Sequence, residues 1–458
     1  MPKYEPILMK NVGVPNSRTL ETYRSRGGYA AAQKVIQEWT PEQTIECVKA
    51  ANLRGRGGAG FPAGMKWSFL PPDRKVTYLC VNADESEPGT FSNRVLMEED
   101  PHQLLEGTLI ASYATKTTVA YIYMRGEFHE QFHILQKALD EAYAAGLFGK
   151  KVFGSAYSVE CYIHRGAGAY VCGEETGLIE SLEGKRGWPR IKPPFPAIEG
   201  LFRKPTVVNN VETLCCVPHI VNRGAEWFKS IGTEGSAGPK LYTLSGPVKR
   251  PGCFEAPLGL SCRDLIFGDD FGQGMVDGKK IKGCIPGGLS MGILTEAELD
   301  CKLDFDDVRK YGLLGLGTAG AIVIPHDADI RQVLANVTRF YSHESCGQCT
   351  QCREGTNWMY KIALRIALGA GRLGDLDLLL EISKNMGMMG GLSICGLPDG
   401  AAFPVRTIVE KYRDEFETHI RRQEPGRVNS VLKRLNPAAY ELPILQPTRK
   451  QAGRLSSA

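Results

Sequence analysis

Four cysteines in the last quarter of the chain constrain its fold more than any other feature. Cys346, Cys349 and Cys352 lie in the run SCGQCTQC, and Cys395 lies in SICG after a helical stretch. Three thiolates on one short loop and a fourth from elsewhere suit the corners of a cubane iron–sulfur cluster, which moves single electrons. Structural zinc sites usually take their ligands as two separated pairs. The spacing therefore favours a cluster, and a zinc site or inert thiols stay open as alternatives.

The bulk composition is that of an ordinary soluble protein with several domains. A chain of 458 residues exceeds what one hydrophobic core usually organises, so roughly two to four domains are expected. The net charge of +4 gives no ground for a nucleic-acid partner. No apolar run reaches the ~18 residues that a bilayer requires, so we expect no direct membrane insertion.

Cysteine usage and the first residues indicate the compartment. Fourteen cysteines without a regular disulfide-like framework suggest reducing surroundings. The N-terminus MPKYEPILMK has neither a secretory apolar core nor an Arg-rich presequence. We therefore expect a cytoplasmic protein.

Short apolar β-rich runs alternate with helical patterns in the first half of the chain. Strands are expected to begin near Lys75, Val119 and Ser158, and helices to cover 41–53, 100–114 and 130–147. This alternation predicts an α/β domain with a largely parallel sheet. Ligands of such sheets bind outside the carboxyl ends of the strands. The polar clusters 82–87, 125–127 and 166–175 follow strands, so we expect them to meet at that edge.

The expected secondary-structure pattern changes at two positions further along the sequence. From about Lys240 a strand, a Pro/Gly turn, a strand and a helix predict a compact α+β module. From about Ile330, amphipathic helices surround the cysteine loop, and the stretch after about residue 423 is rich in Pro and basic residues. We therefore expect segments at 1–236, 237–327, 328–424 and 425–458, the last a surface arm.

A glycine-rich loop, GRGGAGFPAG, is the first candidate binding element. Its glycines allow backbone N–H groups to approach an anion closely, although a plain flexible loop is the alternative. Lys66 follows the loop and is placed to pair with a phosphate or a reduced flavin. Phe61 and Phe69 flank it as flat surfaces for an adenine or nicotinamide ring. The glycines are Gly55, Gly57, Gly58, Gly60 and Gly64.

Carboxylates gather after two of the expected strands. Asp84, Glu85 and Glu87 lie together in NADESEPG, where they are either a solvated acidic turn or acceptors for ribose hydroxyls. Glu174 and Glu175 stand at an expected helix start, where the helix dipole favours negative charge.

Further candidates surround these acids. Tyr170 is expected beside a ring, and Phe195 lies in a Pro-stiffened segment. Asn209 and Asn210 offer amide groups near another helix start. The glycines of the loop that precedes Glu174 are Gly166, Gly168 and Gly173.

Six segments together closely resemble one family. They are 53–67, 82–91, 165–184, 192–200, 204–214 and 344–355, in this order. They resemble the NADH-oxidising flavoprotein subunit of respiratory complex I (NADH:quinone oxidoreductase), and the similarity runs from about residue 20 to about 425. Gln351 departs from relatives that often carry Pro there, which implies only a change in loop stiffness.

The resemblance implies a fold and a set of contacts. The fold is a Rossmann-like domain that holds FMN and NADH, a ubiquitin-like β-grasp (SLBB) module, and a four-helix bundle with a [4Fe–4S] cluster held by the four cysteines. Lys66, Glu87 and Glu175 are the implied catalytic residues. Implied FMN contacts are Gly55, Gly57, Lys66, Asn82, Asp84, Glu87, Tyr170, Gly173, Glu174, Asn209, Asn210 and Thr213. Implied NADH contacts are Phe61, Lys66, Phe69, Glu87, Glu175 and Phe195.

The resemblance also implies an activity and partners. NADH would pass a hydride to FMN, and single electrons would leave through the cluster to a thioredoxin-like [2Fe–2S] subunit and a large multi-cluster subunit, towards quinone. The chain would then lie on the inner face of the bacterial membrane through those subunits. The alternative is the diaphorase subunit of a soluble NAD-linked hydrogenase or formate dehydrogenase.

Overall fold

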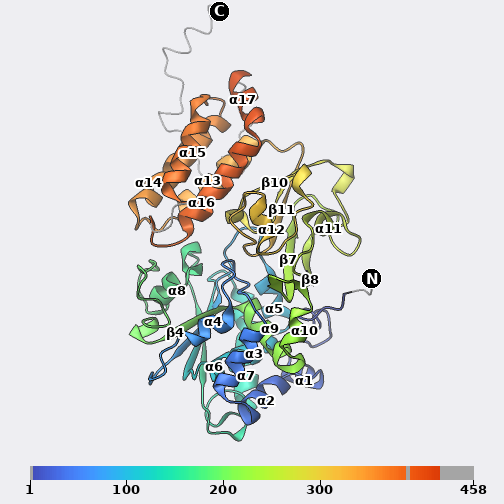
Figure 1. The fold of residues 1–458 in the computed structure, drawn as a ribbon, viewed down its shortest axis with the longest axis vertical. Coiled ribbons are helices and arrows are strands. Elements are labelled where there is room, and N and C mark those ends of the chain that lie inside the picture. The colour runs from blue at the N-terminus through green and yellow to red at the C-terminus, as the bar shows by residue number, and fades with distance from the viewer. Residues whose placement is uncertain (1–3, 388–391, 423–458) are drawn as a thin grey trace, which may run out of the picture. The chain divides into compact units, whose positions relative to one another are not determined.

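A computed structural model describes residues 4–387 and 392–422 (Figure 1). The expected arm at 425–458 lies outside these residues. The chain divides into two compact units, Met1–His326 and Asp327–Ala458. The first unit contains two main sheets, and the second is helical in its described part.

The first sheet is parallel and has the order β3-β2-β1-β4. Strands β2 and β3 follow in order on one side of β1, and β4 pairs with the other side of β1. This order makes a Rossmann-like, doubly wound sheet whose topological switch point lies between β1 and β4. The expected parallel sheet is confirmed. The strands are β1 (Tyr78–Ala83), β2 (Val119–Met124), β3 (Glu160–Arg165) and β4 (Thr206–Asn210).

Helices connect and cover these strands (Figure 1). They are α5 (Ser92–Glu99) and α6 (Pro101–Ala114) before β2, α7 (His129–Ala144) before β3, α8 (Glu175–Leu182) before β4, and α9 (Val211–Arg223) after it. Helix α6 is buried along almost its whole length and packs on α9. A Cβ at Gly107 would lie 2.1 Å from the carbonyl oxygen of Leu214, so glycine is needed where the two helices cross.

Four helices precede or interrupt this pattern: α1 (Leu20–Ser25), α2 (Ala30–Glu38), α3 (Pro41–Ala50) and α4 (Ala63–Ser68). Helix α3 begins as its sequence predicts. The Thr40 hydroxyl accepts the Gln43 N–H at 3.2 Å, and the Gln43 side chain accepts the Thr40 N–H at 2.7 Å. This reciprocal capping box, followed by Pro41 at the first helical position, fixes the helix start.

The second sheet has the order β10-β9-β11-β7-β8 and its own apolar core. Strands β7 and β11 are parallel, and the other pairs are antiparallel. The sheet begins at Pro239, next to Lys240, where the sequence pattern predicts a new α+β module. Its strands are β7 (Pro239–Ser245), β8 (Gly252–Pro257), β9 (Ile281–Ile285), β10 (Leu294–Thr295) and β11 (Gly320–Pro325), with α11 (Cys262–Phe267) and α12 (Asp307–Lys310). Helix α10 (Ala225–Lys229) and the short strands β5 (Gly232–Thr233) and β6 (Ser236–Ala237) precede it.

A buried ion pair joins the two sheets. The Lys240 ammonium on β7 contacts the Glu212 carboxylate on α9, and both side chains are at most 1% exposed. The other Glu212 oxygen accepts the Leu241 N–H at 2.9 Å. The pair therefore fixes the start of α9 against the first strand of the second sheet.

The second unit consists of α13 (Ile330–Glu344), α14 (Thr350–Ala367), α15 (Gly374–Met386), α16 (Leu397–Lys411) and α17 (Arg413–Arg422). Helix α13 packs on α14 and α16, and α15 packs on the same two helices. The expected helix from Ile330 is confirmed, and it leads directly into the cysteine loop.

We predict that Lys240→Ala lowers the free energy of unfolding by about 3–5 kcal/mol, because Glu212 is left as an unpaired buried charge. Urea denaturation of the full chain measures the change. Lys229→Ala is the control, since Lys229 forms a surface pair with Glu226 and should change stability by at most about 0.5 kcal/mol. Equal effects of the two substitutions would contradict the structural role of the buried pair.

Candidate functional site

The predicted polar side chains meet at the carboxyl edge of the first sheet, around its switch point. Asn82 at the end of β1 is in register with Asn210 at the end of β4 and with Tyr123 on β2. The Asn82 side chain donates to the Gly173 carbonyl at 2.8 Å, which brings the segment before α8 to the same edge. Three regions distant in sequence therefore surround one location.

The glycine loop and the helix α4 that follows it are bound to the same place, through α9 and β4. The Arg56 N–H donates to the Thr213 hydroxyl at 2.8 Å, and the Trp67 indole N–H donates to the Asn209 side chain at 2.8 Å. A Cβ at Gly57 would lie 3.0 Å from Cβ of Asn210, so a larger residue would crowd the loop against the helix start.

The first turn of α9 can hold an anion. The Asn210 side chain caps the helix by accepting the Glu212 N–H at 3.0 Å. A helix N-terminus carries partial positive charge and N–H donors, which suit a phosphate group. Gly57 lies against this turn, so the arrangement fits the phosphate of a flavin nucleotide.

Glu175 lies between two lysines. Its oxygens are 3.1 Å from Nζ of Lys66 and 3.0 Å from Nζ of Lys192. Burial alone would raise the pKa of Glu175, but the two ammonium groups hold that pKa below its usual value. Glu175 is therefore an ionised carboxylate at neutral pH. Lys192 also contacts Glu174 at 2.9 Å, and its pKa is raised because the two carboxylates outweigh the effect of burial.

Glu174 has a structural role as well. Its carboxylate accepts the N–H groups of Thr176 at 2.7 Å and Gly177 at 2.9 Å and so caps α8. The expected helix start at these two acids is confirmed.

Glu87 is held by neutral donors. It accepts the Tyr170 hydroxyl at 2.6 Å, the Ser290 N–H at 2.7 Å and the Ser290 hydroxyl at 2.8 Å. Burial raises the pKa of Glu87, and these hydrogen bonds oppose the increase. The structure therefore gives Tyr170, expected beside a ring, a hydrogen bond to an acid.

Three aromatic side chains are exposed for stacking. Phe61, Phe69 and Phe195 are 46%, 50% and 56% exposed, values that leave a face of each ring open to a planar ligand. The rings of Phe61 and Phe69 lie 5.9 Å apart between centroids.

One acid that the sequence left open between two interpretations caps a helix, and two residues that contact the predicted acids were not predicted. Glu85 accepts the N–H groups of Asn93 at 2.7 Å and Arg94 at 2.9 Å, so it caps α5. Lys192 and Ser290 were missed. The Lys–Pro–Pro segment gave no periodic signal for Lys192, and Ser290 lies in another module.

Some of the remaining predicted residues lie on the same edge, whereas Gly60 and Gly64 pack elsewhere, against the Phe305 ring and the Lys49 backbone. The Gly166 N–H donates to the Met124 carbonyl at 2.7 Å, which places that loop past β2 and β3. Gly168 has φ +81° and lies beside Glu127. Asp84 accepts the Ser86 hydroxyl at 2.8 Å at the end of β1. The cofactor-contact roles of all these residues stay predictions.

The cysteine loop lies at the start of α14. Cys349 is the residue just before the helix, and Cys352 is in its first turn. The Ser345 hydroxyl is 3.3 Å from Sγ of Cys352, and the Ile394 N–H donates to Sγ of Cys349 at 3.4 Å, which brings the neighbour of Cys395 to the loop. Hydrogen bonds to sulfur are a common feature of iron–sulfur sites.

The electrostatics of the loop also fit a cluster. Burial raises the pKa of Cys352 to about 11, the nearby Cys349 and Cys346 add to the increase, and the Ser345 hydrogen bond opposes it. Thiolates so placed ionise together only with a cation between them. Within the described ranges, no group of three or more His, Cys, Asp or Glu side chains is arranged to hold a metal ion. A cubane cluster does not require several thiolates to reach one metal ion, because each thiolate binds a different iron of the cluster.

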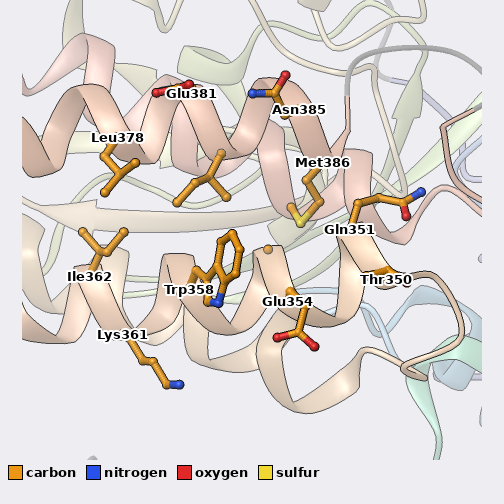
Figure 2. Close-up of a pocket in the computed structure, with 12 residues that line it drawn as sticks. Thr350, Gln351, Glu354, Trp358, Lys361, Ile362, Leu378, Glu381, Asn385 and Met386 are labelled. Atoms are coloured by element: carbon orange, nitrogen blue, oxygen red, sulfur yellow. The ribbon is translucent and has the colours of Figure 1, made fainter.

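An apolar groove of about 760 Å³ lies beside this loop, between α14 and α15. Figure 2 shows Trp358 and Ile362 of α14 facing Leu378 and Met386 of α15, with Glu381 among the polar side chains that point away from the groove. Trp358 is 53% exposed, which is unusual for so large an apolar side chain. Thr350 and Gln351, between Cys349 and Cys352, line one end of the groove. In the residues that the structure describes, no helix is long and apolar enough to cross a membrane.

Family models match both parts of the chain. The Nuo51 FMN-binding domain matches residues 48–219, and the NADH-ubiquinone oxidoreductase-F iron-sulfur binding region matches residues 332–419. The first match contains the glycine loop and the carboxyl edge, and the second contains all four cysteines of the predicted cluster.

Curated relatives match along nearly their whole length. An NADH-quinone oxidoreductase F subunit of Rhizobium meliloti is 49% identical over 91% of this chain and 98% of its own length. The corresponding F subunit of Streptomyces coelicolor is 46% identical over 91% of each chain. That of Rickettsia felis is 45% identical over 92% of this chain and 99% of its own length.

A solved structure has the same fold. The NAD+-reducing [NiFe]-hydrogenase in the air-oxidised state matches with a TM-score of 0.78 and 33% identity, over 97% of this chain and 72% of that one. The identity to the NADH-quinone oxidoreductase relatives is higher, which favours the first interpretation of the sequence over the hydrogenase alternative. The chain belongs to the family of NADH-quinone oxidoreductase F subunits, NADH-oxidising flavoproteins with an FMN-binding domain and a [4Fe–4S] region.

Proposed function

We propose that the carboxyl edge of the first sheet binds FMN and NADH together. The observation that carries this proposal is the contact of Lys66, Glu175 and Lys192 beside the capped start of α9. Bound FMN supplies the conversion of a two-electron donor into single electrons, which the cluster then carries. The protein supplies position and charge.

The described side chains have distinct tasks in this proposal. The Nζ of Lys66 uses two of its three donors on Glu175 and on the Val208 carbonyl, at 3.1 and 3.2 Å, and keeps one for an anionic flavin. Gly57 and the first turn of α9 hold the flavin phosphate. Glu87 accepts a nucleotide hydroxyl, and Glu175 limits the positive charge that the two lysines create.

The aromatic rings and the cysteines complete the assignment. Phe61, Phe69 and Phe195 hold planar rings of the dinucleotide by stacking. Correct alignment of donor and acceptor rings is the main catalytic device, because the hydride step needs no protein acid or base. Cys346, Cys349, Cys352 and Cys395 hold the [4Fe–4S] cluster.

We also propose folds for the other two modules. The second sheet, residues 237–327, is a ubiquitin-like β-grasp (SLBB) module, supported by its mixed sheet and separate core. Helices α13–α16 form a four-helix bundle, supported by their mutual packing. The FMN/NADH domain then covers 1–236 and the cluster domain 328–424.

The partners follow from the electron path. The chain carries one cluster region, so its electrons pass to other subunits of an NADH-quinone oxidoreductase. We propose a thioredoxin-like [2Fe–2S] subunit and a large multi-cluster subunit as neighbours, and attachment through them to the inner face of the bacterial membrane. The exposed groove beside the cysteine loop supports a docking role for α14 and α15. The second candidate, a hydrogenase diaphorase, rests on the likeness to the solved hydrogenase.

Glu175→Gln tests the nucleotide site. Loss of the charge between the two lysines should tighten NAD+ binding about five-fold, on the order of 1 kcal/mol, and slow turnover through product release. Since the pKa of Glu175 lies below its usual 4.5, the difference from wild type should be constant from pH 8 to pH 5. It should decline only at lower pH, where the wild-type carboxylate is protonated.

Isothermal titration with NAD+ and NADH–ferricyanide kinetics measure these effects on the full chain loaded with FMN and cluster. The control is Glu199→Gln, a surface carboxylate near Arg203. An NAD+ affinity that Glu175→Gln leaves unchanged in both redox states would reject this role. A loaded wild-type chain that does not oxidise NADH would reject the proposed function itself.

Ser345→Ala tests the cluster site. The Ser345 hydroxyl lies 3.3 Å from Sγ of Cys352 and would donate to it once Cys352 binds the cluster as a thiolate, so loss of the hydroxyl should make the cluster harder to reduce. A net hydrogen bond of about 1 kcal/mol corresponds to a decrease of roughly 40 mV for one electron. EPR-monitored redox titration measures the midpoint. Ser393→Ala is the matched control, because that hydroxyl donates to the Cys395 carbonyl rather than to sulfur.

Trp358→Glu tests the docking surface. A charge in the apolar groove should weaken binding of the purified thioredoxin-like subunit at least ten-fold, since central aromatic residues dominate interface energies. Biolayer interferometry measures the dissociation constant. Leu373→Glu is the control, an exposed leucine of the same unit outside the groove. Equal affinities of the two variants would remove the groove from the interface.

A further inference from the structure

The Glu87 carboxylate is fixed from outside its own sheet. Glu87 follows β1 of the first sheet, but two of its three hydrogen bonds come from Ser290, in the 3-10 turn Leu289–Met291 of the second-sheet module. The Ser290 N–H and hydroxyl both donate to Oε1 of Glu87, at 2.7 and 2.8 Å. Ser290 is 7% exposed, so water competes little for these bonds.

Other contacts hold the backbone around Glu87 against the same module. The Thr243 hydroxyl of β7 donates to the Gly89 carbonyl at 2.7 Å, and the Leu289 N–H donates to the Pro88 carbonyl at 3.2 Å. A Cβ at Gly288 would lie 2.5 Å from Cγ of Glu87, so the turn approaches the acid as closely as glycine allows. Both the position and the rotamer of Glu87 therefore depend on the second sheet.

The hydrogen bonds leave one acceptor position on Glu87. An ionised carboxylate offers about four lone-pair sites. Ser290 occupies those of Oε1, and the Tyr170 hydroxyl occupies one on Oε2. Among the residues that the structure describes, no other donor occupies Oε2, so one site on it is left for a hydroxyl donor of a bound nucleotide.

We propose that Ser290 is a positioning residue for NADH binding, through which the second sheet fixes the orientation of the Glu87 carboxylate in the nucleotide site. The inference rests on the proposed role of Glu87 in that site. Without the serine hydroxyl, the carboxylate loses a donor and gains rotational freedom. Ordering it again on each binding event then opposes nucleotide binding.

Ser290→Ala on the full chain loaded with FMN and cluster tests the inference. We expect the KM for NADH and the dissociation constant of NAD+ to rise about ten-fold, the loss expected for one hydrogen bond to a charged group. The kcat with ferricyanide should change less than two-fold, because binding rather than the hydride step is affected. Ser290→Thr keeps the hydroxyl and should restore most of the affinity.

Ser245→Ala is the matched control in the same module. Its hydroxyl donates to the Ala321 carbonyl at 3.2 Å and does not contact Glu87. This variant should keep the wild-type KM. If Ser290→Ala does not fold, Ser290→Cys provides the same loss of a strong donor at similar volume. An unchanged KM in a folded variant that lacks the hydroxyl overturns the inference.

A double-mutant cycle separates the inference from the function on which it rests. In a Glu87→Gln background, Ser290→Ala should change the NAD+ affinity less than two-fold, because its effect passes through the carboxylate. Independent, multiplying effects overturn the positioning role while the role of Glu87 stands. An NAD+ affinity unchanged by Glu87→Gln alone overturns the proposed role of Glu87, and the inference with it.

Discussion

The first turn of α9 connects the first sheet, the second sheet and the glycine loop of the first unit. Glu212 in this turn binds Lys240 of the second sheet, and its neighbours Asn210 and Thr213 cap the helix and anchor the glycine loop. A buried charge pair tolerates little displacement, because separation leaves each ion without solvent. The turn that carries the helix cap and the anchor of the glycine loop is therefore held by the same contact that joins the two sheets.

This arrangement explains why the site needs more than a Rossmann-like sheet. A doubly wound sheet supplies a crevice at its switch point, but the residues there sit on loops, which are mobile unless other parts of the protein hold them. Here α9 holds the glycine loop, and the second sheet holds the segment that carries Glu87. Rigid support of loop residues lowers the entropy lost when a ligand binds.

Local signals predicted much of this fold. The strands, the start of α3 at Pro41 and the start of α8 depend on neighbours within a few residues, and the topology rule for parallel sheets brought the polar clusters to one edge. Sequence could not separate a helix cap from a ligand contact, since both use a carboxylate after a strand. Glu85 shows this ambiguity, because it caps α5. Ser290 could not be predicted from the sequence for another reason: its partner Glu87 lies 203 residues away along the chain.

The two acids of the proposed nucleotide site, Glu87 and Glu175, are controlled in opposite ways. Ammonium groups on both sides hold the pKa of Glu175 down, whereas burial among neutral donors raises the pKa of Glu87. Acids whose environments separate their pKa values can take different roles at one pH. Glu175 keeps its charge throughout the physiological range and balances the lysines. Glu87 is more readily protonated, and the hydrogen bonds from Ser290 and Tyr170 favour its ionised form. The second sheet therefore influences the charge of the site as well as its shape, through a serine that no local pattern marks.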